Sequence, residues 1–280
     1  MAPHDLPTIV QTRSHARRVA AALLTSLLCA CASLPPSNKA VIGGATIAYS
    51  RSGSGGPPVV LQSGLGDDRA PWLEVIRGLE GRHAVLAYDR PGYGTSRATT
   101  GPRDPCTVAA EAHALLAVSG LKPPYILVGH SLGGLYQAVY AHLYPEEVAG
   151  LVLLDPTHPQ HWATVQRELP ATATALRALR STVFSAAARR EFDDQAACLD
   201  QLAPLALKQV PTRILVSTRF SALEGPDFQA MVGRLRDDWL RLTGAAAFVP
   251  VAGSGHYLQR DAPAAVVRAI ESLAARAEAR

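Results

Sequence analysis

Ser131 lies at the centre of the pentapeptide Gly129-His130-Ser131-Leu132-Gly133, between an apolar run at 125–128 and a helical pattern that ends at Pro145. A sharp turn from strand into helix crowds the backbone. The positions two before and two after the serine must therefore lack bulk, and both are glycine. Free N–H groups at the start of the helix would stabilise an oxyanion formed beside the hydroxyl. This setting, a nucleophile elbow, indicates a serine placed for nucleophilic chemistry.

The elements that must position this serine alternate along the chain. Apolar runs at 58–62, 84–88, 125–128, 151–154, 213–216 and 247–251 predict buried strands, and helical patterns fall between them and at 262–277. A strand-like stretch at 41–49 turns at Gly43-Gly44. The alternation predicts an α/β fold with a mostly parallel, doubly wound sheet. Its functional groups should lie at the carboxyl ends of the strands.

Residues 158–209 interrupt this alternation. They are rich in alanine, leucine, arginine and glutamine and contain no buried-strand pattern. The stretch predicts a helical insertion within a single domain at 41–280. Because it follows a strand end directly, it would lie over the functional edge of the sheet as a cap.

Residues 1–30 have the charged start, apolar middle and small-residue end of a secretory signal peptide. The ending Leu28-Cys29-Ala30-Cys31 resembles a bacterial lipobox, which would make Cys31 the first mature residue and the site of a lipid anchor. Cleavage after Ala32, which would release a soluble protein, is the alternative. Both predict an exported protein of the bacterial cell envelope, lipid-anchored or periplasmic or secreted, with residues 31–40 as a tether.

The charge balance argues against a nucleic-acid partner. The net charge of +4 includes three arginines of the leader, and no block of lysine or arginine follows it. Any contact with a membrane would then come through the N-terminal anchor alone. Two cysteines remain beyond the leader, Cys106 and Cys198. In an oxidising compartment they could form a disulfide between the main domain and the insertion, and two separate buried thiols are the alternative.

From about residue 41 to its end, the chain resembles the α/β-hydrolase fold family, in its serine esterase and lipase-like branch. The motifs are the serine pentapeptide, Asp89-Arg90-Pro91-Gly92-Tyr93-Gly94, and Gly253-Ser254-Gly255-His256 after the last strand. The resemblance implies that Ser131 is the nucleophile and His256 the general base. A serine hydroxyl needs such a base within hydrogen-bond reach, because alone it attacks poorly at neutral pH.

An acid that orients the histidine completes the set of reactive groups in this family. Most members carry it after the strand that here ends near Thr218, where the next acids are Glu224 and Asp227. Some relatives, including haloalkane dehalogenases, carry it after the preceding strand, and there this chain has Asp155. The resemblance therefore favours Asp155 as the acid and leaves Glu224 and Asp227 as alternatives.

The resemblance also implies an oxyanion hole formed by the backbone N–H groups of Leu65 and Leu132. Most relatives have His-Gly before the first of these, whereas this chain has Ser63-Gly64, which would alter how the loop is braced. The Asp89–Gly94 motif is expected to fix a tight loop without reacting. The other histidines, listed last, are expected to pack in the core or lie on the surface: His83, His113, His130, His142, His158 and His161.

The sequence thus predicts a serine hydrolase that cleaves an ester-type bond of a small molecule through an acyl-enzyme, with no cofactor and no metal. His158 and His161 form His-x-x-His, but no carboxylate pattern accompanies them to favour a metal site. Lactone, thioester, amide and carbon–carbon bond hydrolysis, and acyl transfer, stay open because they use the same groups. Dehalogenase and epoxide-hydrolase chemistry need a carboxylate nucleophile. A non-catalytic exported binding lipoprotein on the same fold is the alternative from another class.

Overall fold

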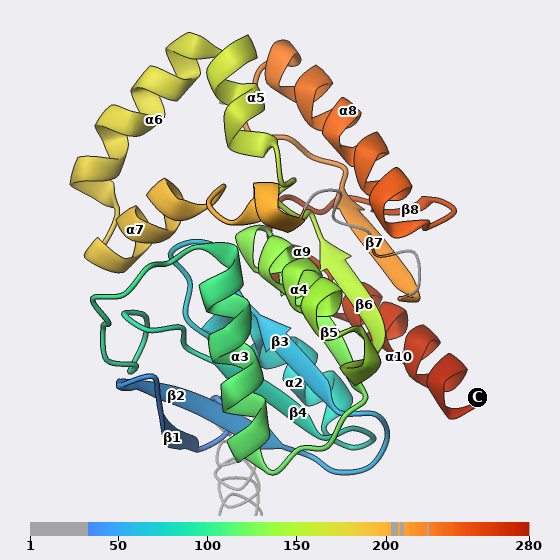
Figure 1. Ribbon diagram of the computed structural model, residues 1–280. Helices are drawn as coiled ribbons and strands as arrows, with labels where there is room; N and C mark the ends of the chain where they lie inside the picture. The colour runs from blue at the N-terminus through green and yellow to red at the C-terminus, as the bar shows by residue number, and fades with distance from the viewer. Residues whose placement is uncertain (1–32, 203–206, 208–209, 223, 280) are drawn as a thin grey trace, which may run out of the picture. The chain divides into compact units, whose positions relative to one another are not determined.

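The computed structural model describes residues 33–202, 207, 210–222 and 224–279 (Figure 1). Leu34–Arg280 forms one compact unit. The predicted signal peptide at 1–30 and the predicted lipidation site, Cys31, lie outside the described residues. No helix in the described part combines the length and the apolar character needed to cross a bilayer.

The centre of this unit is an eight-stranded sheet. Its order is β1 (Ser37–Ile42), β2 (Ala45–Ser52), β4 (Val85–Tyr88), β3 (Val59–Gln62), β5 (Tyr125–His130), β6 (Val148–Leu154), β7 (Thr212–Ser217) and β8 (Phe248–Val251). β1 and β2 run antiparallel, and all pairs from β4 to β8 are parallel. The predicted mostly parallel α/β sheet is confirmed.

The start of the sheet differs from expectation. Residues 37–40, predicted as part of the tether, lie in β1, which pairs with β2 across the Gly43-Gly44 turn. The chain is held even earlier, because the Ser50 hydroxyl donates to the Pro35 carbonyl at 3.1 Å. β1 was not predicted in full because it is an edge strand whose residues are mostly exposed. Such a strand does not need the apolar run by which the buried strands were predicted.

Helices cover both faces of the sheet. α3 (Pro105–Ser119) and α4 (Leu132–Leu143) pack with one set of strand residues, including Val60 and Leu127. α2 (Leu73–Leu79) and α10 (Pro263–Glu278) pack with the alternate set, including Val59 and Val128. Successive residues of a strand point to opposite faces, so a strand covered on both sides must be apolar throughout. That requirement explains why these strands read as continuous apolar runs.

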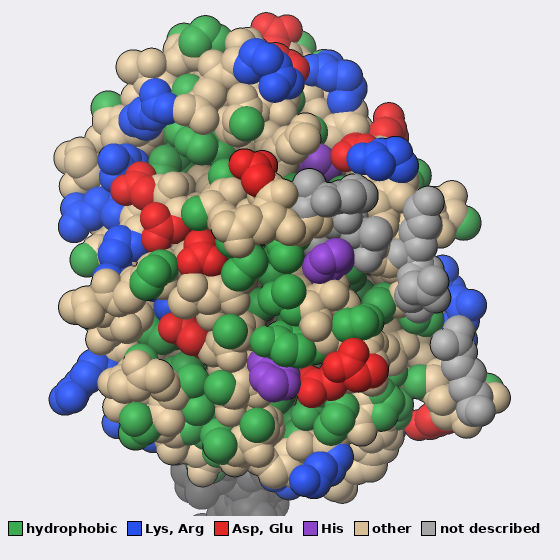
Figure 2. Space-filling model, in the orientation of Figure 1, with side chains coloured by type: hydrophobic (Ala, Val, Ile, Leu, Met, Phe, Trp, Pro, Cys, Tyr) green, Lys and Arg blue, Asp and Glu red, His purple; other side chains and the backbone are tan. Residues whose placement is uncertain are grey.

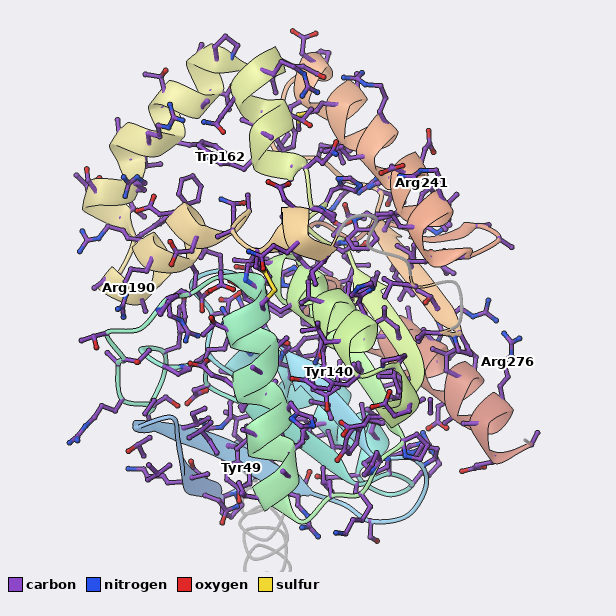
Figure 3. All side chains as sticks on the ribbon, in the orientation of Figure 1. Tyr49, Tyr140, Trp162, Arg190, Arg241 and Arg276 are labelled. Atoms are coloured by element: carbon purple, nitrogen blue, oxygen red, sulfur yellow. A yellow bond between two sulfur atoms is a disulfide. The ribbon has the colours of Figure 1, made fainter. Side chains whose placement is uncertain are left out.

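Between β6 and β7 the chain forms α5 (His161–Glu168), α6 (Pro170–Val183), α7 (Ala186–Asp194) and a short 3₁₀ turn, η4 (Leu199–Leu202). We call residues 161–202 the α5–α7 segment. In Figure 1 it lies beyond the carboxyl ends of the strands, together with α8 (Pro226–Thr243), which follows β7. Trp162 of α5 packs against Phe192 of α7 with ring centroids 4.7 Å apart (Figure 3). Arginine side chains gather along the outer edge of this segment (Figure 2).

A disulfide joins Cys106, at the start of α3, to Cys198, just after α7. It appears as the yellow bond above α3 in Figure 3. Of the two alternatives for these cysteines, the structure has the disulfide. The bond ties the end of the α5–α7 segment to a helix that packs on the sheet.

Candidate active site

Ser131 occupies the turn between β5 and α4 with a strained backbone. Its φ of 53° and ψ of −122° fall in a region that residues other than glycine rarely adopt. Three backbone hydrogen bonds hold the turn in this conformation. The Ser131 N–H donates to the Leu154 carbonyl at 3.0 Å, and its carbonyl accepts from the N–H groups of Gly134 at 2.9 Å and Thr157 at 3.0 Å. These bonds tie the turn to the end of β6 and the loop after it.

The glycines of the pentapeptide are required by close approach. A Cβ atom on Gly129 would lie 2.6 Å from the Cα of Gly134, and one on Gly133 would overlap the backbone oxygens of Gln62 and Ser63. Real Cβ atoms do not come so near to backbone atoms. The expectation that both positions must lack bulk is met by this geometry.

Asp155 and His256, from the ends of β6 and β8, meet at the same edge of the sheet. Nδ1 of His256 lies 3.4 Å from Oδ2 of Asp155. The other oxygen, Oδ1, accepts from the Ser217 N–H at 3.0 Å and from the Arg236 guanidinium at 2.8 Å. The Asp155 side chain is only 6% exposed, and that of His256 is 48% exposed. The carboxylate is thus fixed on three sides, with the imidazole facing open space.

These contacts keep Asp155 ionised. Burial by itself would raise the pKa of this carboxyl, but hydrogen bonds from His256 and Ser217, with the charge of Arg236, hold the pKa below its usual value. Arg236 comes from α8 and also lies 3.2 Å from the Ser217 hydroxyl. The arginine was not found from the sequence, because one arginine on an amphipathic helix carries no local mark of its partner.

The loop that carries His256 is held on both flanks. The Gly255 N–H donates to the Asp261 carboxylate at 2.7 Å, and the Ser254 carbonyl accepts from the N–H groups of Thr218 and Arg219 at 3.2 and 3.0 Å. His130, the residue before Ser131, also contacts this loop. Its Nε2 lies 2.8 Å from the His256 carbonyl oxygen.

His130 is a buried, neutral imidazole. Burial, followed by repulsion from His256, lowers its pKa to about 3. Nε2 therefore carries the proton that is donated to the His256 carbonyl, and Nδ1 has no hydrogen-bond partner in the described part of the chain. The ring also packs against Tyr257 at a centroid distance of 5.0 Å. Packing was expected for this residue, but the hydrogen bond was not.

The two alternative acids make other contacts. Oε2 of Glu224 accepts from the Ser221 N–H at 2.6 Å, and exposed Asp227 lies in the first turn of α8. Among the described contacts of His256, the carboxylate is that of Asp155.

A cavity of about 590 Å³ opens over these groups. Ser131, Asp155 and His256 all contribute to its wall. Its apolar side comes mainly from α8, and His161 of α5 also lines it. The apolar lining residues include Phe220, Phe228, Val232, Leu235 and Trp239. The volume is in the range that holds a drug-sized ligand.

The loop before Leu65 lies against the serine and is braced by Arg90. A Cβ atom on Gly64 would stand 3.1 Å from the Ser131 Cβ. The Arg90 guanidinium donates to the carbonyls of Ser63 at 2.6 Å and Gly64 at 2.8 Å. This arginine belongs to the motif that was expected to fix a loop without reacting, and it braces the Ser63-Gly64 loop.

Arg90 is in turn held by Glu191 of α7. The two side chains form a bidentate pair at 2.9 Å and are 1% and 0% exposed. The Tyr93 hydroxyl donates to the same carboxylate at 2.9 Å, and Arg103 approaches it at 3.5 Å. Burial would lower the pKa of Arg90, but the attraction of Glu191 outweighs it and keeps the guanidinium charged. A buried ion pair thus links the α5–α7 segment to the loop beside Ser131.

The two histidines of His-x-x-His have different surroundings. Nε2 of His158 lies 3.0 Å from the Asp238 carboxylate and its Nδ1 accepts from the Gln160 N–H at 3.1 Å, so this ring is a satisfied packing residue as expected. Both rings line the cavity, and His161 was likewise expected to pack in the core or lie on the surface. The metal-ligand types that cluster in the described residues are Asp104, Cys106 and Cys198, and the two sulfurs belong to the disulfide.

Comparison with known proteins adds the family context. A family model described as alpha/beta hydrolase fold matches residues 57–234. The (lyso)-N-acylphosphatidylethanolamine lipase of Mus musculus is 30% identical over 62% of this chain and 50% of its own. The chain spans half or less of the length of the first curated relatives that it matches.

Solved structures share the fold. A thermophilic esterase from Thermogutta terrifontis superposes with a TM-score of 0.62 at 22% identity, over 86% of this chain and 99% of the esterase. A membrane phospholipase A described as a bacterial virulence factor superposes with a TM-score of 0.65 at 22% identity, over 95% of this chain and 97% of the phospholipase.

Proposed function

The chain belongs to the alpha/beta hydrolase fold family, and on that premise we propose that it is a serine hydrolase that cleaves an ester-type bond of a small molecule. Ser131 is the nucleophile, His256 the general base, and Asp155 the acid that orients the histidine. The backbone N–H groups of Leu65 and Leu132 form the oxyanion hole. The observation that supports this assignment most is the Asp155–His256 contact at 3.4 Å in the wall of the cavity that Ser131 also lines.

The proposed reaction has two balanced steps. Oγ of Ser131 adds to the ester carbonyl while His256 takes its proton, and the two backbone N–H groups stabilise the negative oxygen. The intermediate collapses, the alcohol leaves with the proton from His256, and the acyl group stays on the serine. Water then attacks this acyl-enzyme with His256 again as base, which releases a carboxylic acid and restores the serine.

The nucleophile position argues for this class over others on the same fold. Epoxide hydrolysis and dehalogenation need a carboxylate where this chain has Ser131. The mouse relative is named as a lipase, which agrees with an ester-type substrate. Lactone, amide and carbon–carbon bond hydrolysis use the same groups, and lactones and amides are included as alternative substrates in the test below.

We further propose that the α5–α7 segment acts as a cap over the cavity and that residues 1–30 direct export, with Cys31 as the lipid anchor. His161 of α5 in the cavity wall supports the first part. The leader pattern described above supports the second.

The test is active-site labelling followed by turnover. A fluorophosphonate should modify folded protein at Ser131, mapped by peptide mass, and Ser131→Ala should abolish the adduct. A series of p-nitrophenyl esters of increasing chain length, then lactones and amides, identifies the bond that is cleaved. Folded protein without an adduct on Ser131 and without turnover would favour the non-catalytic binding protein.

A further inference from the structure

His161 lines the cavity, and its imidazole makes no hydrogen bond to the residues that the structure describes. It is the first residue of α5 and lines the cavity with the reactive groups. Its backbone N–H donates to the His158 carbonyl at 2.8 Å, which fixes the turn that carries the ring. Within the described part of the chain, its imidazole contacts the edge of Phe228 at a centroid distance of 6.2 Å and has no hydrogen-bond partner.

His158, the neighbouring histidine, does form hydrogen bonds through its ring, so the lack of a ring hydrogen bond to described residues at His161 comes from where that ring lies. Both nitrogens of His158 are engaged, one by Asp238 and the other by the Gln160 N–H. His161, three residues further along the chain, contacts Phe228 in the apolar wall that α8 forms. A polar group that loses water without gaining a partner is unfavourable, so a ligand that enters here is favoured if it offers one.

The ring offers both hydrogen-bond roles. Burial, followed by repulsion from His158 and His256, lowers the pKa of His161 to about 4, so the imidazole is neutral near pH 7. A neutral imidazole has one N–H donor and one acceptor nitrogen. It gives no charge attraction to an anion, but it suits a hydroxyl or an amide.

We propose that His161 is a substrate-binding residue that pairs with an uncharged hydroxyl or amide group of the substrate that is not part of the bond that is cleaved. The substrate class is then a small ester with an apolar body against α8 and one such polar group. This inference rests on the proposed function, because a substrate-binding role in this cavity assumes that Ser131 acts on a substrate bound there.

The test compares esters that differ by one hydroxyl. On the acyl side the pair is p-nitrophenyl hexanoate and p-nitrophenyl 6-hydroxyhexanoate, and on the alcohol side hexyl acetate and 6-hydroxyhexyl acetate. We expect kcat/KM of the wild type to favour the hydroxylated member of at least one pair about tenfold, as one neutral hydrogen bond in a desolvated site allows. His161→Phe keeps a ring against Phe228 but removes both nitrogens, and should bring the ratio close to one.

Two further variants make the result specific. His161→Gln restores a donor and an acceptor and should recover part of the preference, which a purely structural role of the ring would not produce. Ser221→Ala removes another polar group of the cavity wall, one that is exposed, and should leave the ratio unchanged. A wild type without preference in both pairs would overturn the proposal, as would a preference that survives in His161→Phe.

Binding to the Ser131→Ala variant separates this inference from the proposed function. Calorimetric titration with the same ester pairs measures the preference without turnover. A hydroxyl preference that disappears in Ser131→Ala/His161→Phe supports the binding role even if no ester is hydrolysed by the wild type. Equal affinity for both members overturns the role even if hydrolysis is efficient.

Discussion

Nε2 of His130 donates a hydrogen bond to the backbone carbonyl of His256 at 2.8 Å. The residue next to the proposed nucleophile therefore holds the loop that carries the proposed base. The two rings lie 4.6 Å apart, and both belong to segments that end at the carboxyl edge of the sheet. The neutral imidazole of His130 thus helps to fix the backbone that carries His256.

The burial of the His130 ring gives stability a pH dependence. The pKa of His130 is about 3 in the folded protein, below its ordinary value of 6.5. Between these values the unfolded chain binds the proton more strongly, so stability should fall as pH decreases from about 6.5, by at most about 1.4 kcal/mol for each pH unit. His130→Phe should reduce this slope, measured by urea unfolding between pH 6.5 and 4. An unchanged slope would contradict the buried neutral state of the ring.

Asp155→Asn should lower kcat roughly 10⁴-fold, because the amide would leave His256 without the carboxylate that orients it and stabilises its cation. Glu224→Gln is the matched control, since Glu224 lines the same cavity but accepts from Ser221. Its kcat should stay near that of the wild type. Steady-state kinetics on the best ester of the series measures both, and the reverse ranking would assign the acid to Glu224.

Arg236→Met should destabilise the protein by about 3 kcal/mol at pH 7, since it leaves the buried carboxylate of Asp155 without its cation. Arg236 helps to hold the pKa of Asp155 below its usual value, so its contribution is present at neutral pH and is lost as pH falls through that pKa. The difference between wild type and variant in urea unfolding should therefore shrink below about pH 4. A difference that stays constant with pH would show that the arginine acts only by packing.

Removing the disulfide with Cys106→Ser/Cys198→Ser should cost about 4 kcal/mol of stability. The bond joins residues separated by 92 positions, and closing a loop of this size restricts the unfolded chain strongly. Urea unfolding of the variant against the oxidised protein measures the loss. Alkylation of the denatured wild type without reductant provides the check, and modification of either cysteine would contradict the bond.

Glu191→Gln should lower both stability and kcat. The substitution leaves the Arg90 charge buried without its partner, at a cost of about 3 kcal/mol, and Arg90 braces the loop beside Ser131. Asp193→Asn, two residues away on the same helix, is the matched control. That carboxylate pairs with Arg180 at the surface and should contribute less than about 1 kcal/mol. Equal effects of the two substitutions would contradict the bracing role.

Much of the fold was predictable because local rules and tertiary packing agree. Strands buried on both faces must be apolar throughout, and β3 to β7 read that way. The turn at Ser131 needs glycine on both sides, and the pentapeptide has it. β1 was not fully predicted, because an edge strand with exposed polar residues has neither a continuous apolar run nor a turn that requires glycine on both sides.

The residues of the candidate site could be predicted only where they directly follow a predicted strand or lie in the loop after it. Ser131, Asp155 and His256 follow strands, so the shared edge of a parallel sheet brings them together. Arg236 and Glu191 lie on helices with ordinary amphipathic patterns, and their buried partners depend on how those helices dock. His158 and His161 both line the cavity, and the sequence gives no sign that the His158 ring pairs with Asp238 while the His161 ring contacts Phe228.

The Glu191–Arg90 pair also limits how this protein can be recombined with its relatives. A chimera that took residues 161–202 from another member of the family would have to supply an acid at the place of Glu191, or an uncompensated guanidinium would remain in the dry interior. Exchange of substrate preference by segment grafting should therefore succeed only when the acid and the arginine are inherited together.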